Sequence, residues 1–554
     1  MQIKKFLDVS KEFFWPFLTF GFFAGVSLSV LFDADGWPMN HEHNTFVIRS
    51  LIYAKHYSFY DFFPIYSSLD NNNFGSPFLA FYHKLFYVFS APLFLLISDI
   101  KIALAFSILL FLVIGSFGIF ITLRELKLSK VSALCGGIFL IAANYTITNW
   151  LVRGAMAELS AMMIAPWVFY YFLRMIREKK ISYGLAISLA LVFFAHSVIF
   201  FYIALMLAAT LLLLLFADRK FFDIFLDKSS LLPVALFLAL CLPNFFVIYE
   251  FWQEYDMGSI VSPELNPANN FHSFSDYFLG YRKWQYGQQF QGITCQIDAP
   301  LIIAIIIGFI PILLAPKEKI KLLKPIIPLI IILLFCAILQ MPIAIVFYNH
   351  FFAAEFIQFP WRLLAFITPI IIILALFLLE KFLDERWGRV AILSCLIAMT
   401  LSCGSFSKLN YHYFPTYNSL SDYNNISFNS VAEYVPKRFI NKPFPSFKGI
   451  AENNFLLGCK TVSNQVSDEV KNVRFDFDCK NSAQITLPIF ISKFHKISSN
   501  HQKIFCEESR YMAGLCDVKL PQGQGELQID MPNFFSLFFN PDPSLEIQDT
   551  LPKA

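Results

Sequence analysis

The chain has 554 residues, of which 57% are hydrophobic, 18% aromatic and only 15% charged, and its formal net charge is +3. Soluble domains carry about 25% charged residues, so this composition argues against a soluble enzyme. It also excludes a disordered chain, which needs low hydrophobicity and high charge. Long apolar runs are typical of a polytopic membrane protein. The sequence shows no phosphate loop, nucleic-acid motif or zinc-ligand spacing, and we expect no nucleic-acid partner.

The N-terminal segment predicts a membrane helix that stays uncleaved. Three lysines precede an apolar run over residues 13–32, which is long enough to cross a bilayer. A cleavable signal has a shorter apolar region of about 7–15 residues, and Ala34 is a weak cleavage candidate.

Apolar runs predict a mainly α-helical protein with about eleven transmembrane helices. They cover residues 13–32, 102–123, 131–147, 159–176, 181–196, 198–216, 230–249, 299–315, 325–347, 361–380 and 388–405. Residues 84–98 are apolar but short, and Pro92 interrupts them, so we expect a helix lying at the outer surface. Trp37, Trp150, Trp252 and Trp361 fit belts of aromatic residues at the membrane interfaces.

Basic residues orient the helices, because connections rich in Lys and Arg stay in the cytoplasm. The connections on the other side hold Arg153 and, at a membrane edge, Arg362. The N-terminus is therefore expected in the cytoplasm and the C-terminus outside. The basic connections contain Lys4, Lys5, Lys11, Arg124, Lys127, Lys130, Arg174, Arg177, Lys179, Lys180, Arg219, Lys220, Lys228, Lys317, Lys319, Lys321, Lys324, Lys381, Arg386 and Arg389.

The sequence divides into a transmembrane domain over residues 1–406, with outer loops at 33–101 and 250–298, and an extracytoplasmic domain over 407–554. In the tail the segment VRFDFDC alternates with period two, as a half-buried strand does. PQGQG at 521–525 predicts a turn between two strands. We expect a small β-sandwich. Its predicted strands cover residues 473–479, 484–492, 516–521 and 525–532.

Cysteine usage fits this division of the chain. An even number of tail cysteines in an oxidising compartment indicates disulfides. Cys459, Cys479, Cys506 and Cys516 allow three pairings, of which 459 with 479 and 506 with 516 are favoured as sequence neighbours. Cys295 is alone in the second large loop. Cysteines in or at the ends of spans are expected to pack: Cys135, Cys241, Cys336, Cys395 and Cys403.

Ionisable residues gather at the outer ends of the predicted spans. A charge near the bilayer centre costs at least ~2.5–3.5 kcal/mol, so such residues need a reason. Each alone is explained as a solvated loop charge; Arg153 and Glu158 could pair with each other, and His196 could cap a turn. Together they indicate a polar cavity that opens outward and holds a charged or sugar-like ligand. They are Asp33, Asp35, His41, Glu42, His43, Arg49, Arg153, Glu158, His196, Glu250, Glu254, Glu355 and Arg362.

Several segments, in their order along the chain, resemble those of one family. They are the first loop with Gly75, Pro77 and Tyr82; RGAMAELSAMMIAPW (153–167); AHSVIFFY (195–202); LPNFFVIYE (242–250); WQYGQQFQGITCQID (284–298), with Gln285 in place of a glycine; IQFPWRLL (357–364); and EYVP (433–436). The family comprises bacterial membrane proteins called 6-pyruvoyl-tetrahydropterin synthase-related and the YfhO-like proteins, of the GT-C glycosyltransferase superfamily. Pterin synthase zinc histidines are absent, so that activity is not expected.

The resemblance implies a bacterial inner-membrane glycosyltransferase. It would move a sugar from a polyprenyl-phosphate carrier to an envelope glycan or glycolipid on the outer side. The acceptor hydroxyl needs a carboxylate to take its proton, on the face opposite the leaving phosphate. The resemblance puts the first-loop acid there, which is Asp35 or Asp33, with Glu42 in reserve. Residues two apart in an extended segment face opposite ways, so we expect only one of the two aspartates in the cavity.

The leaving phosphate suits the planar fork of arginine. Arg362 and Arg153 are the first candidates and Arg49 the third, although Arg362 could also be an interfacial anchor beside Trp361. Aromatic rings could stack on the sugar, and a divalent metal between Asp33, Asp35 and His43 is a further hypothesis. The remaining candidate substrate-binding residues are His41, His43, Tyr82, Glu158, His196, Glu250, Trp284, Tyr286, Glu355 and Trp361.

Two other functions stay open. A transporter or flippase of lipid-linked sugars should show internal repeats or helices broken at mid-membrane. A non-catalytic membrane scaffold that binds glycan predicts that a change of Asp35 is harmless. A channel fits least, because no predicted span carries a regular polar stripe.

Overall fold

The structure is a computed structural model, whose contacts divide the chain into two compact units. Unit 1 comprises Met1–Ile48, Leu93–Cys241 and Pro263–Ser419. Unit 2 comprises Arg49–Pro92, Leu242–Ser262 and Leu420–Ala554. The structure describes residues 2–32, 37–38, 40–42, 45–57, 63–68, 70–256, 265–278, 295–314, 319–351, 357–404, 413–414, 434–439, 447–466, 472–509 and 514–534.

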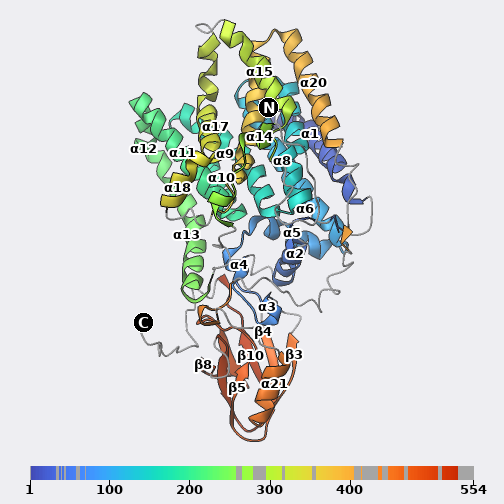
Figure 1. Ribbon diagram of the computed structural model, residues 1–554, viewed down its shortest axis with the longest axis vertical. Coiled ribbons are helices and arrows are strands. Elements are labelled where there is room, and N and C mark those ends of the chain that lie inside the picture. Colours follow the sequence, from blue (N-terminus) through green and yellow to red (C-terminus); the bar gives the residue numbers. More distant parts are fainter. Residues whose placement is uncertain are drawn as a thin grey trace. The chain divides into compact units, whose positions relative to one another are not determined.

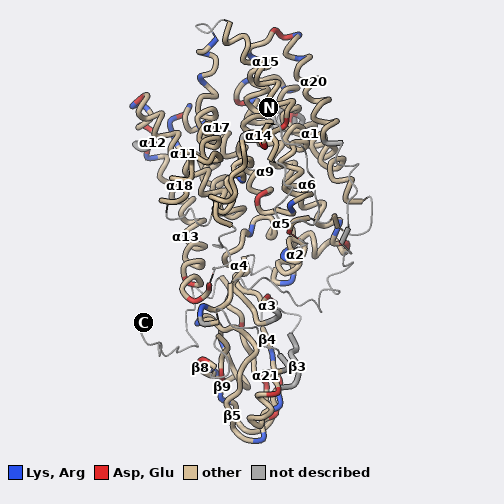
Figure 2. Tube along the Cα trace, in the orientation of Figure 1, with Lys and Arg blue, Asp and Glu red and all other residues tan. Residues whose placement is uncertain are grey.

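Unit 1 is built from long apolar helices, coloured from blue to orange in Figure 1. Figure 2 shows long uncharged stretches along them. α2 (Thr45–His56), α5 (Leu85–Leu96) and α13 (Leu231–Glu254) each pass from one unit into the other. The main helices within unit 1 are α1 (Gln2–Leu28), α6 (Ile100–Glu125), α7 (Lys130–Ala142), α8 (Asn144–Ile147), α9 (Met156–Glu178), α10 (Tyr183–Ala195), α11 (Ser197–Ala217), α15 (Ala299–Leu314), α17 (Ile327–Leu339), α18 (Ile345–His350), α19 (Leu364–Phe382) and α20 (Glu385–Gly404).

Seven helical stretches among the described residues are long and apolar enough to cross a membrane, and α7 with the segment after it makes an eighth if that bent pair is one span. The protein is therefore a helical membrane protein. The seven are Glu12–Phe32, Ile100–Glu125, Met156–Glu178, Ser197–Ala217, Lys228–Glu254, Ile320–Leu339 and Pro360–Phe382.

The predicted total of eleven spans stays a prediction. The spans predicted at 181–196 and 299–315 correspond to the shorter apolar helices α10 and α15, and the span predicted at 388–405 corresponds to α20, which is not among the seven. Residues 84–98 do form a helix, α5, but at 12 residues it is too short to span a bilayer upright. Three of the four tryptophans assigned to interfacial belts, Trp37, Trp150 and Trp361, are instead buried inside the protein.

Helix α19 is buried along almost its whole length, as expected for a helix that is apolar on every side. Close packing around it depends on small residues. In α15, a Cβ atom at Gly308 would lie only 2.5 Å from Cβ of Leu378 in α19. Small residues let two helix backbones approach in this way where lipid tails offer no competing hydrophobic drive.

The helix is interrupted at Ala143, between α7 and α8. The axes of the helical segments Lys130–Ala142 and Asn144–Arg153 are bent by 41° relative to each other. Ala143 has the extended backbone angles φ −63° and ψ 140°. The backbone N–H of Asn144 donates to both carboxylate oxygens of Asp298, each at 3.2 Å. After α8 the chain continues as a π-helical segment, η2 (Thr148–Arg153), which ends at Gly154 in the left-handed conformation with φ 72°.

Unit 2 contains two antiparallel sheets, drawn in orange and red in Figure 1. Phe475, Phe477, Val518, Leu527 and Ile529, drawn from both sheets, share one hydrophobic cluster. Helix α21 (Phe447–Leu456) precedes the first strand. One sheet has the order β3 (Cys459–Val466), β4 (Asn472–Cys479), β10 (Gly523–Asp530), β6 (Lys496–Ser499) and β7 (Gln502–Lys503), and the other has β5 (Ala483–Leu487), β9 (Cys516–Leu520) and β8 (Cys506–Glu508).

Three of the four predicted strands match β4, β9 and β10, and β4 shows the expected alternation of buried and exposed residues. The predicted strand over 484–492 ends earlier, at Leu487. The turn predicted at 521–525 is shorter in the structure, because β9 ends at Leu520 and β10 begins at Gly523, and it connects strands of different sheets. Sheet order depends on contacts between distant residues, which period-two alternation does not specify.

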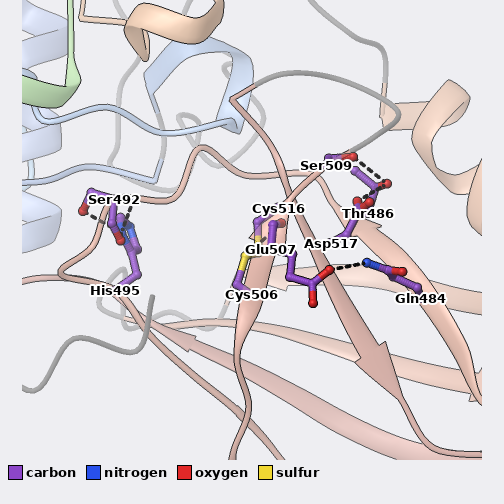
Figure 3. The surroundings of a disulfide bond; sticks show 9 residues. All are labelled: Gln484, Thr486, Ser492, His495, Cys506, Glu507, Ser509, Cys516 and Asp517. Atoms are coloured by element: carbon purple, nitrogen blue, oxygen red, sulfur yellow. Dashed lines mark hydrogen bonds between the residues drawn. A yellow bond between two sulfur atoms is a disulfide. The ribbon is translucent and has the colours of Figure 1, made fainter. Parts of the chain in front are cut away.

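The two disulfides join sequence neighbours. Cys459 and Cys479 are paired across β3 and β4, with Cα atoms 4.0 Å apart, and Cys506 is bonded to Cys516 across β8 and β9. Figure 3 shows the second bond beside a buried group in which the hydroxyl of Thr486 donates to Asp517 at 2.7 Å. The free cysteines Cys135, Cys241, Cys295, Cys336 and Cys395 are buried.

Candidate functional site

Three ionisable side chains meet inside unit 1. Nη1 of Arg153 lies 2.9 Å from Oε1 of Glu158, and Nε of Arg362 lies 3.5 Å from Oε2 of the same carboxylate. The Glu158 side chain is only 1% exposed. Arg153 comes from the end of η2, Glu158 from the first turn of α9 and Arg362 from the short helix η11 (Pro360–Leu363) before α19. We call these three residues the charged cluster.

Local structure explains how Arg153 and Glu158 meet. The left-handed Gly154 ends η2 and lets the chain turn directly into α9. Glu158 lies in the first turn of that helix, where the positive end of the helix dipole favours an acid. The alternative that these two residues pair with each other is therefore correct. Pairing does not exclude a ligand role, because the second carboxylate oxygen faces Arg362.

Hydrogen bonds to two neutral side chains, Asn149 and Tyr145, further fix the positions of Arg153 and Glu158. Nη1 of Arg153 donates to Oδ1 of Asn149 at 2.6 Å and lies 3.4 Å from the hydroxyl of Tyr145, which itself donates to Glu158. The guanidinium carbon of Arg153 lies 4.5 Å from the ring centre of Trp361. Such a cation–π contact contributes most when it is shielded from water. The orientation of Arg153 is therefore strongly determined.

Arg362 makes fewer polar contacts with the described residues than Arg153 does. Its guanidinium carbon lies 4.9 Å from the ring centre of Phe359. Nε of Arg362 and Oε2 of Glu158 are buried, and neither makes a hydrogen bond with any described residue. The Arg362 side chain is 13% exposed. Arg362 therefore keeps donor capacity for an anion, while its carboxylate partner prevents an uncompensated buried charge.

The turn that carries His41 and Glu42 is attached to the same segment. The backbone N–H of His41 donates to the carbonyl of Val152 at 3.0 Å, and that of Glu42 to the carbonyl of Arg153 at 3.1 Å. The Glu42 carboxylate also interacts electrostatically with Arg153. Glu42 is thus the one candidate base that the described structure brings beside the charged cluster.

Two more titratable residues lie near the cluster, outside the candidate spans. The ring of His272 lies 6.4 Å from that of Trp361, and burial lowers the pKa of His272 although Asp276 is 3.7 Å away. Burial also raises the pKa of Cys295, which interacts electrostatically with Arg153 and Glu158. We infer that Cys295 stays a neutral thiol near neutral pH.

Other predicted residues lie elsewhere. His196 caps α11 by accepting a hydrogen bond from the N–H of Ile199 at 3.4 Å, as the capping alternative stated. In unit 2 the guanidinium of Arg49 lies 3.8 Å from the ring centre of Tyr82. Glu250, also in unit 2, accepts from Nζ of Lys493 at 2.6 Å, and Glu254 lies 3.8 Å from the same atom.

Some predicted residues fall outside the described residues, so their placement is untested. This includes the metal hypothesis for Asp33, Asp35 and His43. Within the described ranges, no group of three or more His, Cys, Asp or Glu side chains is arranged to hold a metal ion. The residues outside the description are Asp33, Asp35, His43, Trp284, Tyr286 and Glu355.

Tyr145 and Asn149, which both contact Arg153, were not among the residues predicted for the site. A signal was present, because Tyr145, Asn149 and Arg153 recur every four residues, a spacing that places side chains on one helix face. Phe359, whose ring contacts Arg362, was also not predicted, although it belongs to the IQFPWRLL segment.

Comparison of the sequence with protein-family models gives no match, and comparison with curated proteins gives no significant match.

Proposed function

We propose that this protein is an integral-membrane glycosyltransferase that transfers a sugar from a polyprenyl-phosphate carrier to an envelope glycan or glycolipid on the outer side of a bacterial cytoplasmic membrane. The observation that carries the proposal is the charged cluster of Arg153, Glu158 and Arg362 within a unit of apolar helices. Ionisable groups in such surroundings are costly, and they commonly mark a substrate or ion site. The family resemblance of the first-loop and F-P-W-R segments adds the GT-C assignment.

The geometry of the cluster suits a lipid phosphate. Glu158 and Trp361 hold Arg153, and Glu158 orients Arg362, whose Nε retains a free donor among the described residues. A guanidinium can give two parallel hydrogen bonds to phosphate. We assign Arg362 to the leaving phosphate and Arg153 with Glu158 to its positioning. Asp35, Asp33 and Glu42 are the candidate bases for the acceptor hydroxyl.

The test is mass spectrometry of envelope glycolipids and glycans. Strains would carry wild-type protein, no protein, or the Arg362→Ala, Asp35→Asn, Asp33→Asn or Glu42→Gln variant at matched expression. We expect a defined sugar-bearing species to vanish on deletion, and to stay absent with Arg362→Ala and with one of the acid variants. Arg386→Ala is the control, since this arginine is exposed at the start of α20. Full restoration by all four site variants would refute the enzyme proposal.

One observation favours transport as a second candidate. The break between α7 and α8 places Tyr145, Asn149 and Arg153 on a bent helix pair, and discontinuous helices commonly form the substrate sites of transporters. A transporter would move a lipid-linked sugar across proteoliposome membranes without changing its mass. An enzyme would convert donor and acceptor to a product of new mass, so one assay with labelled donor separates the two.

A further inference from the structure

Asn40 lies at the edge of the charged cluster and has an unusual environment. Its side chain is 3% exposed, yet neither its amide nitrogen nor its amide oxygen makes a hydrogen bond with any described residue. Burying an amide in this way is unfavourable, and most buried side-chain amides are paired. A native structure that retains such a group needs an explanation.

The amide is fixed against the segment that carries Arg153. A Cβ atom at Gly154 would lie 2.8 Å from the amide nitrogen of Asn40 and 2.9 Å from its oxygen. The two backbone hydrogen bonds from His41 and Glu42 to Val152 and Arg153 hold the neighbouring residues in register. Only a glycine at position 154 leaves room for the Asn40 amide, so the two segments pack closely against each other at this point.

The segment that carries Asn40 and the segment that carries Arg153 each contain a further polar atom without a hydrogen bond to any described residue. The indole N–H groups of Trp37 and Trp150 are buried and make no hydrogen bond within the described part of the chain. Contacts then run from Asn40 to Gly154, to the adjacent Arg153, and through Glu158 to Arg362. Arg362 can donate to an anion, and the Asn40 amide can both donate and accept. The two residues therefore belong to one connected group of side chains.

We propose that Asn40 is a specificity-determining residue that recognises a hydroxyl group of the sugar carried on the lipid phosphate, an assignment that rests on the proposed function. A hydroxyl both donates and accepts, and a side-chain amide is neutral and does the same. A phosphate accepts only, so it would use the amide nitrogen and leave the oxygen unpaired. The chemistry of Asn40 thus fits the sugar, and that of Arg362 fits the phosphate.

The experiment compares lipid binding by the full-length protein in nanodiscs. The probes are polyprenyl phosphate without a sugar, polyprenyl-phosphate glucose, mannose and galactose, and the singly deoxygenated analogues of the hexose that binds best. We expect Asn40→Leu to weaken binding of that hexose lipid about tenfold, which corresponds to the loss of about one hydrogen bond. Binding of the sugar-free lipid should stay unchanged. One deoxy analogue should bind Asn40→Leu and wild type equally.

Thermal unfolding without ligand gives a readout that a structural role would not produce. Asn40→Leu removes an unpaired buried amide, so its Tm should rise. Asn454 in α21 is the matched control, because it is 1% exposed and its amide exchanges two hydrogen bonds with the backbone of Thr486, at 2.9 and 3.0 Å. Asn454→Leu should lower Tm and keep the lipid preference. Asn40→Asp keeps the shape and loses the donor, and it replaces Asn40→Leu should that variant not fold.

The outcomes separate the two proposals. A wild-type protein that binds no polyprenyl phosphate, or an Arg362→Ala variant that binds as well as wild type, overturns the proposed function. A wild type that prefers the hexose lipid, together with an Asn40 variant that keeps the full preference, overturns only the role of Asn40. A lower Tm with equal weakening of both lipids also overturns it, since Asn40 would then be structural.

Discussion

Arg153 and Glu158 lie on either side of the left-handed Gly154 and form an ion pair of 2.9 Å, in which the carboxylate is 1% exposed. The same carboxylate faces Arg362 through its other oxygen, at 3.5 Å. One acid therefore compensates two arginines that come from distant parts of the sequence. The stability of unit 1 and the proposed phosphate site depend on the same side chain.

Replacing Glu158 with glutamine should be strongly destabilising. The substitution keeps the shape but leaves two buried guanidinium groups without their carboxylate, and breaking a buried pair costs about 3–5 kcal/mol. Thermal unfolding in detergent is the measurement. Glu385→Gln is the control, because Glu385 and Arg389 are largely exposed and such pairs contribute about 0–1 kcal/mol. Equal shifts in Tm for the two variants would contradict the described burial of Glu158.

Gly154→Ala should destabilise the protein and disturb the position of Asn40. An L-residue at φ 72° costs roughly 1–2 kcal/mol, and the added Cβ atom would also overlap the Asn40 side chain. The measurement is again the midpoint of thermal unfolding. Gly25→Ala in α1 should be neutral or slightly stabilising, because nothing lies within 4 Å of its Cβ position. A Tm for Gly154→Ala equal to that of wild type would contradict the left-handed turn.

The stability of unit 2 should depend on pH through His495. Its Nδ1 accepts from the N–H of Ser492 at 2.9 Å, its ring meets that of Tyr66 edge to face, and burial lowers its pKa from 6.5 to about 3. Between these values the unfolded chain binds a proton that the folded one does not, so stability falls as pH falls below 6.5. At pH 5 the loss is about 2 kcal/mol.

Chemical unfolding at a series of pH values between 4 and 8 tests this dependence. His495→Gln should remove most of the slope between pH 6.5 and 4. His501→Asn, a change at an exposed histidine of the same unit, should keep it. A slope that survives His495→Gln would assign the dependence to other groups.

The two disulfides should each stabilise unit 2 by about 3 kcal/mol. They close loops of 20 and 10 residues in sequence separation, and the chain-entropy estimate for loops of this size is about 3 kcal/mol. Denaturant unfolding of Cys459→Ala/Cys479→Ala and of Cys506→Ala/Cys516→Ala measures each contribution. Maleimide labelling of the denatured, unreduced protein should leave all four tail cysteines unmodified. Labelling of any of the four would show that this cysteine is a free thiol and not part of a disulfide.

Local sequence patterns predicted where the helices and strands lie better than they predicted which of them contact one another. Apolar runs located most of the helices, and the alternation of VRFDFDC located β4. Strand β3 was missed because its sequence, CKTVSNQV, is mostly polar. The pairing of Arg153 with Glu158 was foreseen as an alternative because the two are close in sequence.

Long-range contacts were not predictable in the same way. Nothing local in the sequence relates Glu158 to Arg362 or Asn40 to Gly154, because these contacts arise only when distant segments of the chain pack together. The sequence could suggest Arg362 as a phosphate ligand from its residue type and its place at a span end. It could not show that Glu158 orients Arg362, or that Asn40 has an unpaired amide.

The bond between Asn144 and Asp298 has a consequence for how the protein is made. In a bilayer, a backbone N–H released at a helix break must find a partner within the protein. That partner, Asp298, lies 154 residues later in the chain. During synthesis the kinked hairpin of α6 and α7 therefore leaves the ribosome, and meets the insertion machinery, well before its carboxylate exists. Its final geometry is reached only after the helices in between have been inserted, so truncation before Asp298 should leave this hairpin exposed to membrane quality control.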